Sequence, residues 1–322
     1  MRNLGEAHNI VLWAPDDSYL SFYNSPYVGH TTSKAVDIYP HTAEWACDAL
    51  SPTDGTVKRI QKVKMGREKQ FPSSEFDYGI GISPEADNGI IVRILHCIPD
   101  IEIGDKIERG DKLGRTLRSR YFNYWTGPHY HVEVMNERDF SRSTQSYVLT
   151  PNISDVNQVY QVKPLNSNAM QFEIEISQIN EDNMIGFSSD IPYGSASGLN
   201  GHLGFSRDRK THGIIDGGIP HYKTGGLHSL NGKLSDDIFF CNNMIGTCLD
   251  GGFIFTISKN ISVHLDDLRL KGLSFFLYPK TLTSKGRPPI VLIPSKRSQF
   301  MNIFSIGDQA ILSIRELTRD EN

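Results

Sequence analysis

The stretch Gly127-Pro128-His129-Tyr130-His131-Val132-Glu133-Val134 is the most informative part of the sequence. From Tyr130 onward the residues alternate in the manner of a β-strand. Side chains two residues apart on a strand point to the same face, so His129 and His131 are expected together, about 7 Å apart. Two such imidazoles can bind one metal ion, or one can bind the metal while the other transfers a proton. A pair of surface histidines would give the same pattern, so the motif alone leaves these alternatives open.

His30 and Asp37 form a second candidate group for metal binding. His30 lies in the loop-like stretch 29–33, whereas Asp37 lies inside the strand pattern 35–39. A buried carboxylate between Val36 and Ile38 would need a partner, and a metal ion would supply one. The solvent-facing side of a half-buried strand is the common alternative. Imidazole and carboxylate together suit zinc, which accepts both in tetrahedral sites.

Short alternating or apolar segments separated by turns predict β-strands throughout the chain. We expect strands within 10–23 and at 35–39, 55–63, 80–82, 90–95, 130–135, 172–176, 252–257, 273–278 and 290–293. No amphipathic helix is expected before residue 150. The chain is therefore expected to be mainly β. His96 follows the segment 90–95, and a lone histidine in that place usually has a structural role.

The length of 322 residues predicts two domains. The polar stretch 151–168 is the expected linker, which gives a first domain at 1–150 and a β-rich accessory domain at 169–322. The second domain contains a glycine-rich stretch, 194–232. Its histidines, expected in loops, leave a second metal site as an alternative to an incidental grouping. They are His202, His212, His221 and His228.

Composition and charge restrict the functional classes. The net charge of −4 and the absence of a long Lys/Arg cluster argue against a nucleic-acid partner. No apolar stretch approaches the roughly 18 residues of a membrane span. Four scattered cysteines suit a reducing compartment better than a disulfide scaffold, although Cys241 and Cys248 could pair. No signal-peptide core is evident, so a cytoplasmic location is expected, or a secreted or cell-surface one if a leader has been removed.

Residues 25–136 resemble the lysostaphin/LytM-type zinc metallopeptidases. The resemblance rests on the order of five features: His30 with Asp37, the segment Ser51-Pro52-Thr53-Asp54-Gly55-Thr56-Val57, Leu95-His96, the Gly-Asp turns at 104–105 and 110–111, and Gly127-Pro128-His129-Tyr130-His131. It implies a lysostaphin-like antiparallel β-sheet of the barrel-sandwich type (the duplicated hybrid motif). It also implies a zinc-dependent endopeptidase that acts on peptide or peptidoglycan-like substrates, often at Gly-containing bonds.

The resemblance also implies a role for each candidate residue. His30, Asp37 and His131 would hold Zn²⁺, and three protein ligands would leave one position for water, as in catalytic zinc sites. His129 would be the general base, and His96 would assist it. Glu133 would share a face with His131 and orient it, although a solvent-facing glutamate is the ordinary interpretation.

Two segments depart from the family pattern, and two other functions compete with it. His41 to Ala46 replaces a Gly-Thr-Pro turn, and Arg115 to Thr126 is rich in arginine and aromatic residues instead of glycine. Both departures affect the expected substrate. A biotinyl-type carrier would need a lysine after the Gly-Asp turns, but Lys64 precedes them. A non-catalytic metal-binding or regulatory protein with the same fold is the second alternative, and an intracellular peptide is the alternative substrate.

Overall fold

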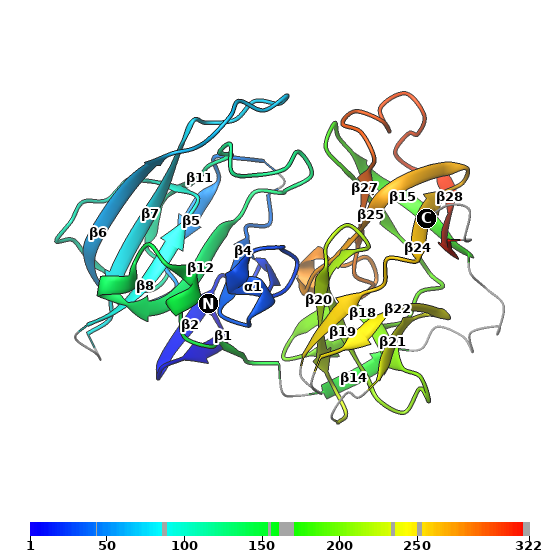
Figure 1. Cartoon of the computed structure of the whole chain (residues 1–322), viewed down its shortest axis with the longest axis horizontal. Coiled ribbons are helices and arrows are strands. Elements are labelled where there is room, and N and C mark those ends of the chain that lie inside the picture. Colours follow the sequence, from blue (N-terminus) through cyan, green and yellow to red (C-terminus); the bar gives the residue numbers. More distant parts are fainter. Residues whose placement is uncertain are drawn as a thin grey trace. The chain divides into compact units, whose positions relative to one another are not determined.

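The computed structural model describes residues 1–42, 44–85, 89–153, 156–160, 171–232, 236–249 and 253–317 (Figure 1). Almost all their regular structure is β-strand, so the prediction of a mainly β protein is confirmed. The chain divides into two compact units. The first contains Met1–Phe22 and Tyr27–Asn152, and the second contains Tyr23–Pro26 and Ile153–Asn322. Most of the expected linker, 154–155 and 161–168, lies outside the described residues, and the proposed boundaries stay a prediction.

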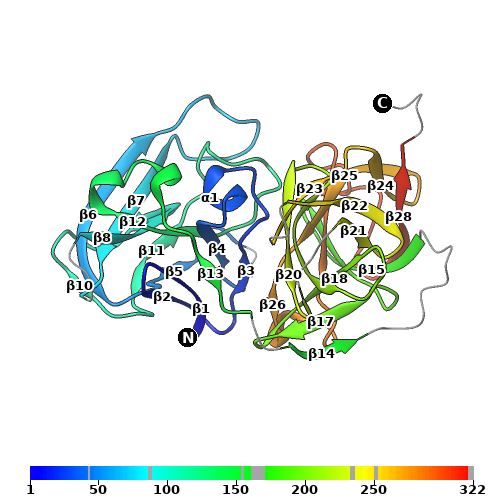
Figure 2. The ribbon, with the colours of Figure 1, turned by 60° about the horizontal axis from the view of Figure 1, so that its bottom comes forward.

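A seven-stranded antiparallel sheet forms the framework of the first unit (Figure 2). Its strands in spatial order are β10 (Lys106–Ile107), β6 (Gly55–Lys64), β7 (Phe76–Ser83), β8 (Ile90–Leu95), β12 (Tyr130–Asn136), β4 (Ala35–Tyr39) and β3 (Tyr19–Ser21). The central strands β8, β12 and β4 are buried on both faces almost throughout. Polar side chains on these strands are therefore enclosed by protein and need partners there.

Two small sheets and a few helical turns complete this unit. One sheet contains β13 (Thr150–Pro151), β1 (Arg2–Ala7) and β2 (Ile10–Ala14), and the other contains β5 (Asp48–Leu50), β11 (Lys112–Thr116) and β9 (Cys97–Pro99). The helical turns are α1 (Val28–Thr31), η1 (Glu137–Asp139) and η2 (Ser143–Gln145). The prediction of a loop at 29–33 was wrong for 29–31, because the Thr31 amide bonds to the Tyr27 carbonyl and closes one helical turn. This turn places His30 beside the sheet.

The second unit is also built from β-strands, most of which pair in two closed rings. They are β14 (Val156–Tyr160), β15 (Gln171–Ile179), β16 (Met184–Phe187), β17 (Tyr193–Ala196), β18 (Leu199–Ser206), β19 (His212–Ile219), β20 (Thr224–Ser229), β21 (Asp237–Phe240), β22 (Asn243–Cys248), β23 (Ile254–Ile257), β24 (Ile261–Leu265), β25 (Leu268–Phe275), β26 (Tyr278–Pro279), β27 (Ile290–Pro294) and β28 (Gln309–Glu316), with a helical turn η3 (Lys280–Leu282). The strands β18, β21, β22, β23, β20 and β19 pair in a ring, and β25, β24, β28, β15, β16 and β27 pair in another. Closure leaves few unpaired edges in either ring.

Most of the glycine-rich stretch 194–232 is strand, in β17 to β20. Glycine permits the close packing here: a Cβ atom on Gly201 would lie 2.2 Å from Ile214 Cγ2. The expectation that its histidines lie in loops was wrong for His202, His212 and His228, which lie on strands β18, β19 and β20. The second unit has its own core, which includes Phe172, Phe240 and Phe275.

Two further expectations concern the cysteines and the membrane. All four cysteines are free thiols, so Cys241 and Cys248 do not form the bridge that was left open. Among the described residues, no helix has the length and apolar character that a bilayer span requires.

Candidate functional site

Strand pairing places Asp37 and His131 next to each other. Asp37 on β4 lies directly opposite His131 on β12. Directly opposed residues of an antiparallel pair share a sheet face and lie within contact distance. The Asp37 Oδ1 atom is 2.8 Å from His131 Nδ1. Both side chains are buried, so the solvent-facing alternative for Asp37 was wrong.

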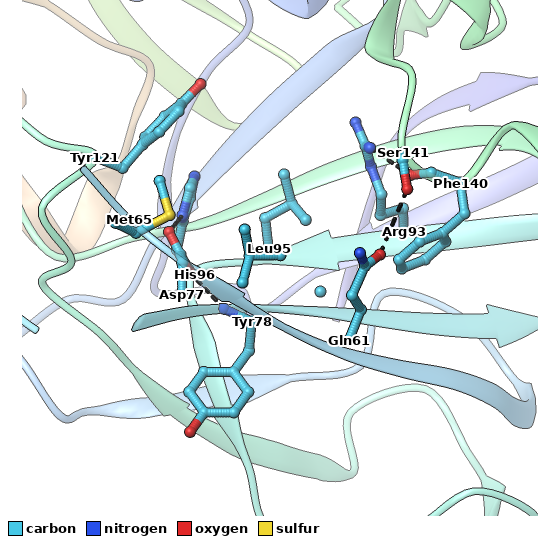
Figure 3. Close-up of a pocket in the computed structure, with 12 residues that line it drawn as sticks. Gln61, Met65, Asp77, Tyr78, Arg93, Leu95, His96, Tyr121, Phe140 and Ser141 are labelled. Carbon is cyan, nitrogen blue, oxygen red and sulfur yellow. Dashed lines mark hydrogen bonds and ion pairs between the residues drawn. The ribbon is translucent and has the colours of Figure 1, made fainter. Parts of the chain in front are cut away.

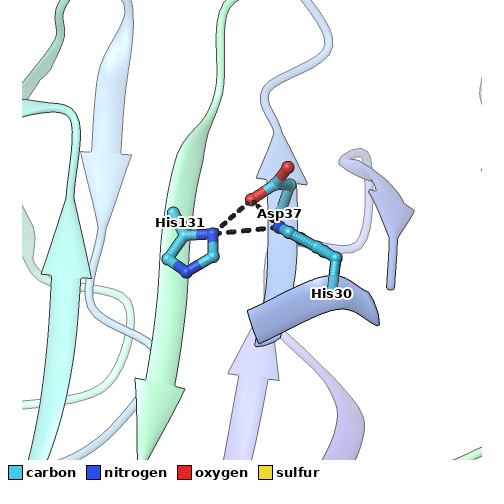
Figure 4. Close-up of side chains that lie close together, drawn as sticks. All are labelled: His30, Asp37 and His131. Atoms are coloured by element: carbon cyan, nitrogen blue, oxygen red, sulfur yellow. Dashed lines mark hydrogen bonds and ion pairs between the residues drawn. The ribbon is translucent and has the colours of Figure 1, made fainter. Parts of the chain in front are cut away.

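The helical turn α1 brings His30 to the same point (Figure 4). The His30 Nδ1 atom donates to the Phe22 carbonyl at 2.9 Å, which directs Nε2 toward the strands. His30 Nε2 lies 3.1 Å from His131 Nδ1 and 3.2 Å from Asp37 Oδ1. The sequence contains no local signal for this encounter, because 101 residues separate His30 from His131.

Together these three residues form a group that can hold a metal ion. One ligand atom from each lies within 4.8 Å of the other two, and all three residues are buried. Two imidazole nitrogens and one carboxylate oxygen match the donors that zinc prefers, and three protein donors leave an open position. The residues therefore fit a zinc ion by donor chemistry and by convergence.

The electrostatics of the group also favour a cation. Burial alone would raise the pKa of Asp37, but the neighbouring His30, His129 and His131 hold that pKa well below its ordinary value. Burial alone would lower the pKa of His131, but Asp37 and Glu133 raise it to about 9. Asp37 and Glu133 thus favour the form of His131 that carries a proton on both ring nitrogens at neutral pH. A metal ion that binds here replaces one of these protons.

Glu133 holds the other edge of the His131 ring. Its Oε1 atom lies 3.0 Å from His131 Nε2, and its side chain is fully buried, so the solvent-facing interpretation was wrong. Arg93, directly opposite on β8, forms an ion pair with Glu133 Oε2, and Ser146 Oγ donates to the same oxygen at 3.0 Å. These contacts lower the pKa of Glu133 to about 2 even though burial opposes the shift. Glu133 is therefore an ionised acceptor that fixes the orientation of His131.

His129 lies beside the three candidate ligands and leaves one nitrogen facing them. Its Nδ1 atom donates to the Gly127 carbonyl at 2.9 Å, and Nε2 lies 3.6 Å from Asp37 Oδ2. Burial lowers the pKa of His129 to about 4, although the Asp37 charge opposes this. The imidazole is thus neutral near pH 7 and can accept a proton at Nε2. Because it is buried, the interpretation as a surface histidine was wrong.

His96 reaches the same region through a turn in the backbone. It has a φ of 69°, in the left-handed region that non-glycine residues seldom adopt. This turn after β8 brings its ring to 5.5 Å from the His129 ring and 6.1 Å from the His131 ring, centroid to centroid. Strained backbone of this kind is often found at functional sites.

Asp77 on β7 fixes the His96 ring, and sequence inspection missed it. Its Oδ2 atom lies 2.7 Å from His96 Nδ1 and accepts a hydrogen bond from Ser119 Oγ at the same distance. The expected strand 80–82 actually begins at Phe76. Extending the alternation back to Asp77 would have placed this carboxylate on one face with Gly79 and Gly81.

The aromatic residues of 115–126 form a wall of the site. The Phe122 ring packs edge-on against His96 and His129, with centroid distances of 4.5 and 5.0 Å. Tyr121 stacks obliquely on His96 at 5.1 Å and lies 4.5 Å from the Tyr27 ring. The aromatic residues of 115–126 therefore change the surroundings of His96 and His129, and the histidines still lie close together.

Two family models match the chain. Residues 13–151 match the N-terminal domain of a domain of unknown function (DUF8155), and residues 188–286 match the DUF8155 C-terminal domain. A search of curated proteins found no match. The matched regions agree with a chain of two parts, and the family descriptions assign no activity.

Two solved structures are similar to parts of the chain. A mutant of the catalytic domain of the prophage-encoded M23 protein EnpA from Enterococcus faecalis is 17% identical, with a TM-score of 0.29, and the match covers 42% of this chain and 92% of that one. Lysostaphin is 12% identical, with a TM-score of 0.28, and the match covers 75% of this chain and 88% of that one. TM-scores this low do not by themselves establish a shared fold.

The histidines of the second unit do not form a comparable group. Over the described residues, His30, Asp37 and His131 are the only set found that could hold a metal. His228 instead lies 3.3 Å from the buried carboxylate of Asp216, and His202 packs between the rings of Phe240 and Phe275. The alternative of a second metal site therefore receives no support from the described part of this unit.

Proposed function

We propose that the first unit is a zinc-dependent endopeptidase that hydrolyses peptide bonds with a metal-activated water. One observation carries the proposal: three candidate ligands from separate parts of the chain converge within 4.8 Å, and two further imidazoles adjoin them. Zinc held by His30, Asp37 and His131 would supply Lewis acidity and a water of lowered pKa. The resemblance in sequence order suggests the same chemistry.

The two adjoining histidines have distinct parts in this proposal. His129 is neutral and presents Nε2, so it can take a proton from the attacking water and return it to the leaving amine. His96 is held at Nδ1 by Asp77, and its ring lies 5.5 Å from the His129 ring, centroid to centroid. In its protonated form, His96 would donate a hydrogen bond to the oxyanion that develops on the peptide carbonyl.

The substrate class follows from the resemblance. We propose a peptide or peptidoglycan-like substrate, with Gly-containing or cell-wall-type peptides as the first candidates. An intracellular peptide is the alternative, which a cytoplasmic location would favour over a secreted or cell-surface one. The second unit would act as an accessory module.

A non-catalytic, metal-binding or regulatory protein is the second candidate function. It is favoured by the hydrogen bonds within the site itself, since His131 already lies between Asp37 and Glu133. Such a closed network could serve stability or metal storage without hydrolysis.

Hydrolysis by the zinc-loaded full chain separates the two candidates. Cleavage of a peptide library, including glycine-rich and cell-wall-type peptides, is followed by mass spectrometry. For the endopeptidase, His129→Ala should lower kcat by about 10²–10⁴-fold while the zinc content is unchanged. His212→Ala is the matched control, because this half-exposed histidine lies in the second unit. Bound zinc with no cleavage of any peptide would favour the non-catalytic protein.

A further inference from the structure

A pocket of about 340 Å³ opens next to His96 in the first unit (Figure 3). Pockets that hold small ligands begin at roughly this volume. Its lining includes Val63, Met65, Gly79, Leu95, Tyr121 and Phe140. Figure 3 shows Met65 and Tyr121 beside His96 at one end, with Phe140 and Arg93 at the other. The pocket is therefore continuous with a residue of the candidate active site.

Strand register shows that the pocket floor and the candidate ligands share one sheet face. Directly paired residues run across the sheet in the order Gln61, Gly79, Leu95, His131 and Asp37, from β6 through β7, β8 and β12 to β4. Residues paired in this way point to the same side. Neighbouring strands are about 4.8 Å apart, so a peptide of a few residues in extended form could reach from the ligands to the floor.

The lack of a side chain at Gly79 leaves space for the pocket. A Cβ atom added there would lie 3.2 Å from Leu95 Cδ2 and 3.2 Å from the Phe140 ring, tighter than ordinary contact. A larger side chain at this position would have to occupy the pocket. The hollow thus depends on one residue without a side chain.

The charged groups that line the pocket are already engaged by the protein. Asp77 bonds to His96 and Ser119, and Arg93 pairs with Glu133 and also bonds to Ser143. The remaining lining of the pocket is mostly apolar, and the neutral polar side chains of Gln61 and Ser141 lie at its rim. A charged side chain would find no free countercharge among these residues and would lose hydration on entry.

We propose that this pocket receives a large apolar or aromatic side chain of the peptide substrate, close to the scissile bond. The inference rests on the proposed endopeptidase function and narrows its substrate class. A glycine at that substrate position would leave the pocket empty, whereas leucine or phenylalanine would fill it. Even one methylene in an apolar pocket changes kcat/KM by about 10–200-fold, so a whole side chain should change it by at least 10-fold.

The test compares peptides that differ only at one position, which carries Gly, Leu, Phe or Glu, with the zinc-loaded full chain. The parent peptide is the best substrate of the library, and each residue near the cut is varied in turn. We expect kcat/KM for Phe or Leu to exceed that for Gly and Glu by at least 10-fold at one of these positions. Gly79→Leu should remove most of this preference, because the new side chain occupies the pocket.

A second variant guards against misfolding of Gly79→Leu. Val63 lies at the rim with 42% exposure, so Val63→Phe should narrow the pocket without disturbing the core. Gly66→Ala is the matched control, because a Cβ atom there meets nothing within 4 Å. The preference for Phe over Gly should fall in Val63→Phe and stay unchanged in Gly66→Ala.

Binding of the same peptides to the His129→Ala protein, followed by calorimetry, separates failure of the pocket from failure of the endopeptidase. Hydrolysis with equal kcat/KM for all four side chains would overturn the pocket and leave the endopeptidase standing. Tighter binding of the Phe peptide, lost on Gly79→Leu, would support the pocket even if no peptide were cleaved. Equal affinity for all peptides, with no cleavage, would overturn both proposals.

Discussion

His131 lies between two carboxylates, and this arrangement sets the properties of the candidate site at the scale of single residues. Asp37 accepts at one edge of its ring and Glu133 at the other, while Arg93 balances the charge of Glu133. Carboxylates that bond to a ligating histidine fix its tautomer and raise its basicity. Glu133 should therefore act on zinc through His131 without touching the metal.

Glu133→Gln should weaken zinc affinity by about 10- to 100-fold, because the amide is a poorer acceptor and removes a charge behind His131. Affinity can be measured by competition with a coloured chelator. The same variant should lower thermal stability, since it leaves Arg93 without its buried partner. Ser146→Ala is the matched control: it removes one hydrogen bond to Glu133 and keeps the charge. Equal zinc affinity in the Glu133→Gln and native proteins would show that Glu133 has no such role.

The candidate site could be predicted from the sequence only in part, and the missed residues share a physical reason. His30, Asp37, His96, His129 and His131 stand out because few structural roles demand that order of residue types. Asp77, Ser119 and Arg93 do not stand out, since their roles arise from register and from turns that join distant segments. The pocket floor at Gly79 also depends on pairing across the sheet.

At the scale of elements, glycine explains why one group of strands was missed. Strands β4 and β8 have the predicted bounds because Val36, Ile38 and their equivalents carry the apolar pattern. Strands β17 to β20 contain too many glycines to show the apolar alternation of a strand. Their glycines instead allow close packing against neighbouring strands. Strand β1 was also missed, because its sequence mixes charged and small residues.

Gly201→Ala should lower the free energy of unfolding of the second unit by about 1–3 kcal/mol, because an added methyl group overpacks the strand pair β18–β19. The new Cβ atom would clash with Ile214 and approach the Phe276 carbonyl. Urea unfolding followed by far-ultraviolet circular dichroism measures the change. For comparison, Gly66→Ala points into open space and should have little effect. Native stability in Gly201→Ala would contradict the close packing inferred here.

At the scale of the whole molecule, acid should destabilise the second unit. His202 on β18 is buried beside aromatic rings, and burial lowers its pKa to about 4. In the unfolded chain the same group has an ordinary pKa near 6.5. Between these two pH values His202 is protonated in the unfolded chain and neutral in the folded chain. The free energy of unfolding therefore falls as the pH drops from about 6.5 to 4.

The second unit should therefore lose about 2 kcal/mol of stability between pH 7.5 and 5 from His202 alone. Because Trp13, Trp45 and Trp125 all lie in the first unit, tryptophan fluorescence does not report this change. The change in stability can be followed by hydrogen exchange of the β17–β18 peptides, measured by mass spectrometry. His202→Leu should reduce the pH dependence by this amount, because the buried His221, whose pKa is lowered to about 3, still contributes. A variant with the native pH dependence would exclude His202 as a cause.

Zinc stoichiometry of the purified full chain tests the central claim most directly. After zinc loading and dialysis, mass spectrometry of the elements should find one zinc ion per chain. Replacing any of His30, Asp37 or His131 by alanine should remove it, whereas His212→Ala should keep it. A native chain that binds no zinc, or a His131→Ala chain that still holds one tightly, would contradict the three-ligand site and the endopeptidase built on it.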